Sequence, residues 1–585
     1  MKEDNEKIPS PKKIEKEISE FLTKKFGDNV KIISPLMLPQ EETVEKDRRY
    51  SHTGKGINFS MKPEELVAYL DQYIVKQESA KAILATKICT HFNRIKHIQA
   101  AGNNISEMVG SIKNNVLMIG PTGVGKTYLI KLIAAKIGVP FVKGDATKFS
   151  ETGYVGGDVE DLVRDLVREA DGDIDLAQYG IIYIDEIDKI ASSHNLIGAD
   201  VSRTGVQRAL LKPLEETEVD LKVPHDPISM MQEIERFRKT GERDKRTVNT
   251  KNVLFIVSGA FTELIPIIGK RISDQGIGFG ANISKPQEQI DILKHVRSED
   301  LIAFGFESEF VGRLPVRSVF EKLTKEDLFE ILKNPNNPII LGKKLDFSAY
   351  GIDIKFEDEA LRILAEYAFD ENTGARGLIS AVEKALLVFE KKLPSTDIKQ
   401  FAVTADVIEN ARDSLKDILE KPEDTKWAED FQRLSRAEKE SVKDYIRRNQ
   451  SNLAEKYNLT LTPSRIDILA TFYCRHVMDI NHTIKKIKTF YDEIKKLELS
   501  FFKSHDINIV LEDDAVDCII EQVVISSASI ASFYDRMSDD LKLGLKLIRE
   551  KTGKNRFFIT RQALNDPETF INTLIKNELS MLRET

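Results

Sequence analysis

The sequence predicts an α/β fold, in which a parallel sheet flanked by helices precedes a mainly helical region. Three short apolar runs are bounded by turn or polar residues, at 116–119, 181–184 and 253–257. Continuous apolar runs of this length are typical of strands buried on both faces. Helical stretches lie between them, as at 128–137 and 159–170, and this alternation indicates a parallel sheet. After Pro315 the pattern becomes mostly helical.

The order of these patterns predicts five segments. Residues 1–62 are polar, charged and interrupted by prolines, so we expect a flexible N-terminal segment there. Helical spacing of apolar residues begins at Pro63. The remaining four segments are a large α/β domain (63–320), a small helical α+β domain (321–418), a charged helical segment (419–503) and a degenerate copy of the small domain (504–585).

A weak internal repeat is the basis of that last segment. Residues 352–360 match 507–515 at an offset of 155, and residues 401–404 match 557–560 at an offset of 156. Both copies have the pattern of strand, helical stretch and strand. General strand–helix patterning is the alternative explanation, and we favour a duplicated small domain.

Composition limits the class of protein. The 585 residues include 86 Lys and Arg and 94 Asp and Glu, which gives a net charge of −8 and argues against a dedicated nucleic-acid binder. Three widely spaced cysteines exclude a disulfide framework and a four-cysteine zinc module. The sequence has no apolar run of about 18–20 residues and no secretory signal at its start. We therefore expect a cytoplasmic protein with no membrane contact.

A phosphate-binding loop is the clearest motif. It has the pattern G-x-x-x-x-G-K-[ST] and consists of Gly120, Pro121, Thr122, Gly123, Val124, Gly125, Lys126 and Thr127. It follows a predicted buried strand and precedes a predicted helix, which is the context that the motif requires. Backbone N–H groups and the helix N-terminus would bind phosphates, Lys126 would reach the β- and γ-phosphates, and Thr127 would ligate Mg²⁺.

Two acidic residues follow the second predicted strand. Burying carboxylates at a strand end costs free energy, so Asp185 and Glu186 indicate a function beyond an ordinary acidic turn. Asp185 would hold Mg²⁺ directly or through water, and Glu186 would polarise the attacking water. Together with the phosphate loop, this pair predicts hydrolysis of ATP.

The motifs together resemble the Clp/HSP100 class of AAA+ proteins, and within it the ClpX-type unfoldases. The resemblance covers about residues 63–418. Its matching blocks, in the order of the family, are 70–77, 120–127, 152–160, 182–190, 200–207, 276–280, 309–315 and 373–377. It implies an AAA+ module with a helical small domain, and a mainly helical C-terminal extension would follow. The family's N-terminal zinc module is missing.

The resemblance assigns roles to further residues of the nucleotide site. It implies that Ile74 and Val75 pack on adenine, although Lys76 follows them where the family usually has glycine. Ser258 matches the sensor 1 position and Arg376 matches sensor 2. At an offset of 155 the counterpart of Arg376 is Ala531, so we expect the second copy to bind no nucleotide.

The resemblance also implies assembly. Arg313 matches the arginine finger, which reaches the γ-phosphate of a neighbouring subunit. A finger acting in trans requires a ring, and the family forms homo-hexamers.

Two glycine-flanked loops match parts of the family that contact other proteins. Tyr154 and Val155 resemble the pore loop that grips a polypeptide; an ordinary exposed turn is the alternative. Ile277, Gly278 and Phe279 resemble the loop that docks on the peptidase ClpP; the alternative is that the loop tucks these side chains into its own domain.

A basic loop with six Lys or Arg residues at 236–246 would select acidic or C-terminal tails, or would simply be solvated.

We therefore expect an ATP-dependent protein unfoldase and translocase that forms the regulatory ring of a ClpP-type protease. Its substrates would be unfolded or tagged proteins. No serine or cysteine peptidase signature occurs in residues 419–585, so proteolysis would come from the partner. The alternatives are a stand-alone protein-remodelling chaperone and, less in keeping with the acidic charge, a nucleic-acid motor.

Overall fold

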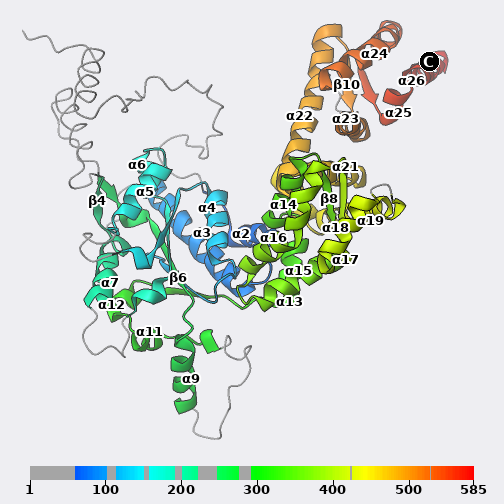
Figure 1. Ribbon diagram of the computed structural model, residues 1–585. Coiled ribbons are helices and arrows are strands. Elements are labelled where there is room, and N and C mark those ends of the chain that lie inside the picture. Colours follow the sequence, from blue (N-terminus) through cyan, green and yellow to red (C-terminus); the bar gives the residue numbers. More distant parts are fainter. Residues whose placement is uncertain are drawn as a thin grey trace, which may run out of the picture. The chain divides into compact units, whose positions relative to one another are not determined.

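The computed structural model describes most of the chain from Phe59 onwards. The described residues are 59–101, 113–149, 157–191, 201–221, 247–275, 292–421, 424–526 and 529–584 (Figure 1). The predicted polypeptide-gripping residues Tyr154 and Val155, the docking loop at 277–279 and the basic loop at 236–246 lie outside these ranges, as does most of the N-terminal segment.

A five-stranded parallel sheet forms the centre of the large domain. Its strand order is β2-β3-β6-β1-β7. The strands are β1 (Val116–Ile119), β2 (Phe141–Asp145), β3 (Ile181–Asp185), β6 (Leu254–Gly259) and β7 (Val316–Val319). The three inner strands are the three predicted from apolar runs, and nearly all of their residues are buried. The parallel α/β sheet is therefore confirmed.

The two edge strands have no continuous apolar run in the sequence. In β2 the sequence Phe-Val-Lys-Gly-Asp has one fully buried residue, and in β7 buried and half-buried residues alternate. A strand with one neighbour keeps one edge near solvent, so polar residues such as Lys143 and Arg317 are tolerated there.

Helices flank the sheet (Figure 1). The described helices of the large domain are α2 (Pro63–Leu70), α3 (Glu78–Ala101), α4 (Lys126–Ile137), α5 (Asp161–Glu169), α6 (Ile174–Ala177), α7 (Val201–Leu214), α9 (Leu264–Gln275), α11 (Ser298–Phe304) and α12 (Ser308–Gly312). Of these, α3, α4 and α5 contact strands of the sheet, whereas α9 contacts α11 and extends away from the sheet (Figure 1). An antiparallel pair, β4 (Glu218–Asp220) and β5 (Thr247–Asn249), lies apart from the main sheet.

The small domain follows β7 directly. It contains α13 (Lys325–Lys333), α14 (Pro338–Ser348), β8 (Asp353–Phe356), α15 (Asp358–Asp370), α16 (Ala375–Lys392), β9 (Gln400–Val403), α17 (Ala405–Glu409) and α18 (Ala411–Glu420). One cluster of buried apolar side chains runs from Phe59 through the sheet to Ile418, so the two domains share a core.

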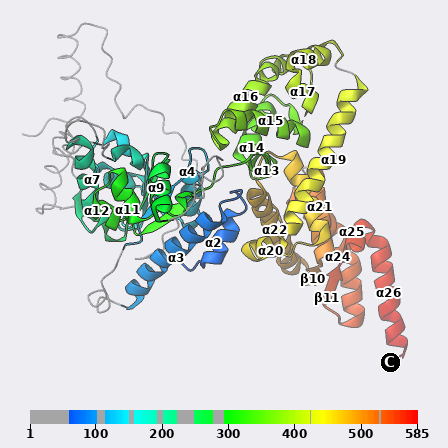
Figure 2. The same cartoon turned by 90° about the horizontal axis from the view of Figure 1, so that it is seen from below.

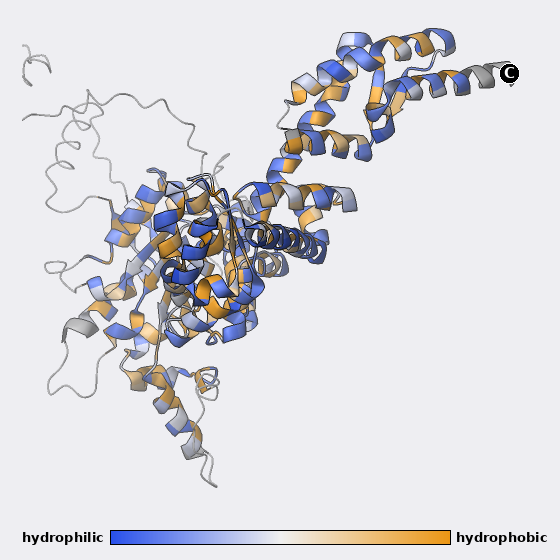
Figure 3. Cartoon of the chain, turned by 45° about the vertical axis from the view of Figure 1, so that its right-hand side comes forward, coloured by the Kyte–Doolittle hydropathy of each residue, from blue (hydrophilic) through white to orange (hydrophobic). Residues whose placement is uncertain are grey.

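The C-terminal extension has a separate apolar core, which runs from Val442 to Ala563. It begins with α19 (Thr425–Arg448) and α20 (Gln450–Tyr457). The remaining elements are α21 (Pro463–Arg475), α22 (Ile480–His505), β10 (Asn508–Leu511), α23 (Asp513–Ser526), α24 (Ile530–Thr552), β11 (Arg556–Ile559), α25 (Arg561–Asn565) and α26 (Pro567–Glu584). Figure 2 shows α20 and α21 beside α19. Hydrophilic and hydrophobic residues alternate along these helices (Figure 3).

The order of elements from α21 to α26 matches the order in the small domain. In each segment two helices, a strand, two helices, a second strand and two helices follow one another, and the two strands pair in parallel. Threonine caps occupy matching places, since Thr324 and Thr462 cap the first helix while Thr404 and Thr560 cap the seventh element. No helix in the described parts of the chain is both long and apolar enough to cross a membrane.

Candidate active site

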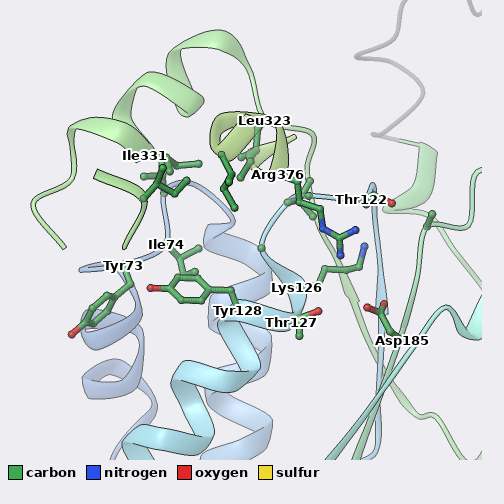
Figure 4. Close-up of a pocket in the computed structure, with 18 of the residues that line it drawn as sticks. Tyr73, Ile74, Thr122, Lys126, Thr127, Tyr128, Asp185, Leu323, Ile331 and Arg376 are labelled. Atoms are coloured by element: carbon green, nitrogen blue, oxygen red, sulfur yellow. The ribbon is translucent and has the colours of Figure 1, made fainter. Parts of the chain in front are cut away.

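A cavity of about 420 Å³ lies where the carboxyl ends of β1 and β3 meet the small domain (Figure 4). Three parts of the chain line it: the turn after α2, the loop and acidic residues at the sheet, and the small domain. The predicted site residues on its wall are Ile74, Val75, Thr122, Gly123, Val124, Gly125, Lys126, Thr127, Asp185, Glu186 and Arg376. Gly120 and Pro121 are set back from the cavity and contact it through Lys126.

The phosphate loop joins β1 to α4 and touches the small domain through its backbone. Gly123 has a left-handed φ of 77°, and a Cβ atom there would lie 2.0 Å from the carbonyl oxygen of Thr373. The N–H of Ala375 donates to the carbonyl oxygen of Gly123 at 2.8 Å. A side chain at position 123 would therefore force the loop and the small domain apart.

Lys126 is the buried cation of the loop. Its side chain is 9% exposed, and its ammonium donates to the carbonyl oxygens of Gly120 at 2.5 Å and Pro121 at 2.8 Å. Burial lowers the pKa of Lys126 to about 8, although nearby Asp185 and Asp188 oppose the shift. Burial removes the water that would stabilise the charged ammonium, and an anion bound in the loop would stabilise that charge instead.

A line of hydroxyl groups connects the loop to Asp185. The Ser258 hydroxyl donates to Oδ1 of Asp185 at 2.7 Å, so the Tyr183 hydroxyl must donate to Ser258, at 2.6 Å. The Thr127 hydroxyl in turn donates to Tyr183 at 3.0 Å. Ser258, near the end of β6, thus contacts Asp185 of the acid pair directly.

Asp185 is held in its ionised form. Burial alone would raise its pKa, but hydrogen bonds from Ser258 and Lys143 and the charge of Lys143 keep the pKa below the ordinary value. The Lys143 ammonium lies 3.0 Å from Oδ2 of Asp185. The carboxylate at the end of β3, an inner strand of the sheet, is therefore charged at neutral pH.

Glu186 has a backbone conformation that few non-glycine residues adopt. Its φ is 58° and its ψ is 33°, and its N–H donates to Oδ1 of Asp185 at 3.1 Å. Its side chain is exposed on the cavity wall. A left-handed glutamate costs on the order of 1 kcal/mol, and such outliers concentrate at functional sites.

The opposite end of the cavity is apolar. Ile74 and Val75 form part of this wall with Leu323, Ile331 and Ile379. Lys76 does not line the cavity. It has a φ of 60°, and its ammonium lies 3.0 Å from Asp327 at the start of α13. The lysine thus adopts the backbone conformation for which glycine is suited and points its charge away from the apolar wall.

The two predicted arginines lie in different places. Arg376, in the first turn of α16, faces the cavity near Lys126 (Figure 4). Arg313 is absent from the wall of this cavity. Its half-exposed guanidinium pairs with Glu215, and its carbonyl oxygen accepts from Asn115 at 3.1 Å.

Several site residues could not be identified from motifs. Tyr183 lies inside the apolar run Ile-Ile-Tyr-Ile, where its hydroxyl group was the one available signal. Lys143 lies on an edge strand that has no apolar run, and Tyr73 lies in the turn after α2, where no motif marks it. Asn334 and Asn337 reach the cavity from the loop between α13 and α14.

Comparisons with known proteins agree with this geometry. Residues 112–317 match the AAA domain of the Cdc48 subfamily, and residues 323–389 match the C-terminal D2-small domain of ClpB protein. The ATP-binding subunit ClpX of the ATP-dependent Clp protease from Treponema denticola is 42% identical over 337 residues, which are 57% of this chain and 77% of the relative. The ClpX subunits of Borrelia duttonii and Borrelia recurrentis are each 42% identical over 351 residues, or 60% of this chain and 78% of theirs.

These matches confirm the predicted AAA+ module, its small domain and its activity as an ATP hydrolase. The residues beyond 418 lie outside both family matches and form the helix-rich extension. With 42% identity across more than three quarters of its relatives, this chain belongs to the ClpX family of AAA+ ATPases.

Proposed function

We propose that this chain is an ATP-driven protein unfoldase and translocase that serves as the regulatory ring of a ClpP-type protease. The observation that carries the proposal is the single cavity in which the phosphate loop, the Asp185–Glu186 pair, the Ile74–Val75 wall and Arg376 meet. The relatives are named as ATP-binding subunits of an ATP-dependent Clp protease, which supports the same function here.

ATP would lie across the cavity from its apolar end to the phosphate loop. The adenine would pack on Ile74 and Val75, and the triphosphate would accept hydrogen bonds from the backbone of residues 120–127 and from Lys126. The hydrogen-bond partners of the buried Lys126 ammonium are neutral carbonyl oxygens. A bound phosphate would add a negatively charged partner, which stabilises the ammonium more strongly.

Thr127 and Asp185 are the residues that would hold Mg²⁺. The Thr127 hydroxyl uses its proton on Tyr183, which leaves oxygen lone pairs for a cation, and Asp185 is a charged carboxylate. Hydroxyl and carboxylate oxygens are ligands that suit this ion. When bound, Mg²⁺ would offset the charge of the phosphates.

Glu186 would orient the attacking water and draw away its proton. Ser258 would keep Asp185 in place, and Arg376 would respond to the nucleotide from the small domain. Arg313, which does not line the cavity of its own chain, would act on the γ-phosphate of a neighbouring subunit in a homo-hexamer. A finger of this kind increases the rate by roughly 10³–10⁵.

The contacts with other proteins rest on the resemblance of two loops. Tyr154 and Val155 would grip the threaded polypeptide, and Ile277, Gly278 and Phe279 would dock on the peptidase. The first loop would use ATP turnover to pull the polypeptide through the ring, and the second would deliver that polypeptide to the peptidase.

Capture of substrates by Glu186→Gln tests the proposed function. This variant should bind ATP, hydrolyse it poorly and therefore retain protein clients in the ring during a pull-down. Lys126→Ala, which should not bind ATP, is the matched control and should retain few. Recovery of nucleic acid in place of protein would contradict an unfoldase.

Deletion of residues 277–279 separates a protease subunit from a stand-alone chaperone. If the loop docks on a peptidase, the deletion abolishes degradation by the added ClpP-type partner and leaves ATP hydrolysis intact. Unchanged degradation would contradict the docking assignment.

A further inference from the structure

The N-terminal end of α22 in the extension contacts the apolar end of the nucleotide cavity from behind. The side-chain amide of Asn481 donates to the Tyr73 hydroxyl at 2.6 Å and to Oε1 of Gln72 at 3.3 Å. Tyr73 lines the cavity and directly precedes Ile74 and Val75. Asn481 is 8% exposed, so this contact lies within the protein.

The orientation of the Asn481 amide is fixed. Its Oδ1 accepts from the Lys456 ammonium at 2.6 Å and from the Tyr457 hydroxyl at 2.8 Å, both on α20. With its oxygen held by two donors of the extension, the amide nitrogen must face Tyr73 and Gln72. The extension therefore presents a donor of defined direction to the residues before the adenine-binding pair.

A second buried amide, that of Asn336, connects the turn at Gln72 to the small domain. Asn336 donates to the carbonyl oxygen of Gln72 at 3.1 Å and to the Tyr445 hydroxyl at 2.8 Å. Its Oδ1 accepts from the N–H of Ile480, the first residue of α22, at 3.1 Å. Tyr445 belongs to α19, so Asn336 connects two helices of the extension to Gln72, which directly precedes the cavity residue Tyr73.

The loop that carries Asn336 also lines the cavity, through Asn334 and Asn337. The Tyr473 hydroxyl of α21 donates to the carbonyl oxygen of Pro335 in this loop at 3.0 Å. Both the turn before Ile74 and this loop thus have one side on the nucleotide cavity and the other on the extension.

We propose that Asn481 and Tyr445 are positioning residues for the adenine end of the nucleotide site. The extension must be docked for the site to have full affinity, so loss of these contacts would weaken nucleotide binding. The inference rests on the proposed function because it takes the Ile74–Val75 wall as the adenine end.

The position of these contacts predicts which nucleotides are affected. They lie beside Tyr73 at the apolar end, and none of them involves a residue of the phosphate loop, so they act on the part that ATP and ADP have in common. Losing one of these buried hydrogen bonds should raise the Kd of both nucleotides by the same factor, roughly five- to tenfold. The KM for ATP should rise similarly, while kcat stays within about twofold.

The test measures binding of fluorescent ATP and ADP analogues to full-length Asn481→Ala and Tyr445→Phe. The second variant removes a single hydroxyl and keeps the tyrosine ring, which guards against misfolding of the first. Asn572→Ala and Tyr491→Phe are matched controls, since Asn572 is exposed on α26 and the Tyr491 hydroxyl points to Asp513 within the extension. Both controls should bind as the wild type does.

A double variant distinguishes positioning through Tyr73 from a general loss of structure. In a Tyr73→Phe background, Asn481→Ala should add much less than its effect in the wild type. Wild-type affinity in both single variants, or fully additive effects in the double variant, would overturn the inference. A wild-type chain that binds neither nucleotide would overturn the proposed function itself.

Discussion

Tyr183 links the phosphate loop to the acid pair at the scale of single residues. Its hydroxyl accepts from Thr127 and donates to Ser258, and burial raises its pKa to about 12, so it remains protonated at neutral pH. Movement of Thr127 when a nucleotide binds would therefore shift Ser258 and Asp185 through this chain of hydrogen bonds. This side chain is a means of coordinating the two halves of the site.

Replacing Tyr183 by phenylalanine should disrupt this coordination. The buried Ser258 hydroxyl and the half-buried Thr127 hydroxyl would each lose a partner, so we expect a loss of about 1–3 kcal/mol in the free energy of unfolding and a fall of roughly tenfold in kcat for ATP. Urea unfolding and steady-state hydrolysis measure the two effects. Tyr179→Phe, whose hydroxyl accepts from Gln99 away from the cavity, should hydrolyse normally. A Tyr183→Phe variant with wild-type kcat would contradict the account of the relay.

Lys126 predicts a pH dependence of nucleotide affinity. Its pKa in the free protein is about 8, and bound phosphate favours the charged form and raises that pKa. The Kd for ATP should therefore be level below pH 7.5 and rise above pH 8, by up to about tenfold per pH unit. Isothermal titration across this range is the measurement. Lys126→Arg, whose charge does not titrate there, should bind more weakly with a flat profile; the same slope in both proteins would assign it to another group.

The same lysine affects stability with the opposite trend. Its folded pKa lies below the ordinary value of 10.5, so the unfolded chain binds more protons between pH 8 and 10.5. The contribution of Lys126 to the stability of the free protein is therefore unfavourable below about pH 8 and is relieved as the pH rises through that range.

At the scale of elements, the contact between α15 and α16 depends on Gly377. A Cβ atom there would lie 2.8 Å from the carbonyl oxygen of Ala368 and 2.9 Å from the Thr373 hydroxyl. Gly377→Ala should therefore separate the two helices and destabilise the protein by about 1–3 kcal/mol.

Gly342 is the matched control, inside α14 with nothing within 4 Å of an added Cβ. Gly342→Ala should stabilise the protein by up to about 1 kcal/mol because alanine is the better helix former. Thermal unfolding compares the two variants. Equal changes in stability in both variants would mean that the close approach at Gly377 does not contribute to the stability of the protein.

The sequence patterns predicted the inner strands but not the edge strands. Apolar runs marked β1, β3 and β6 because these strands are covered on both faces and both edges. β2 and β7 lack that signature because their surroundings are partly polar.

The repeat was visible in the sequence only around its two strands. Helix α22 has 26 residues where α14 has 11, so the offset between the similar segments changes within this helix and hides the match of the preceding helices. A comparison at one constant offset therefore detects only the part of the repeat that follows this helix.

The motif residues of the nucleotide site were predictable because each is fixed by local sequence. The phosphate loop and the acid pair follow strands whose apolar runs are plain, so their meeting at one sheet edge follows from the parallel order. Asn336 and Asn481 could not be predicted in this way. They are separated from Gln72 by 264 and 409 positions, and only the folded chain brings them together.

At the scale of the whole molecule, Glu438 joins the extension to the small domain. It lies between Lys344 and Lys355, with its carboxylate 2.8 Å from the Lys355 ammonium. Burial would raise its pKa, but the two ammonium groups hold it below the ordinary value. This contact contributes stability at neutral pH that is lost as the pH falls through the folded pKa.

Glu438→Gln should loosen the extension because it removes the counter-charge of the nearly buried Lys344 and leaves Lys355 paired with Asp353 alone. Breaking a buried pair in this way costs about 3–5 kcal/mol, and limited proteolysis between residues 418 and 430 should become faster. Glu440→Gln, on the exposed side of the same helix, removes a surface pair with Lys443 and should change stability by less than about 1 kcal/mol. Equal protease resistance of the two variants would contradict this description of the junction.

The central claim is that ATP hydrolysis in this cavity drives the unfolding of other proteins. Its most direct test measures ATP hydrolysis and the loss of fluorescence of a folded, tagged fluorescent protein in the same reaction. We predict that Glu186→Gln abolishes both signals, and that Tyr154→Ala keeps hydrolysis while unfolding falls sharply. Unfolding at the wild-type rate by either variant would contradict the claim.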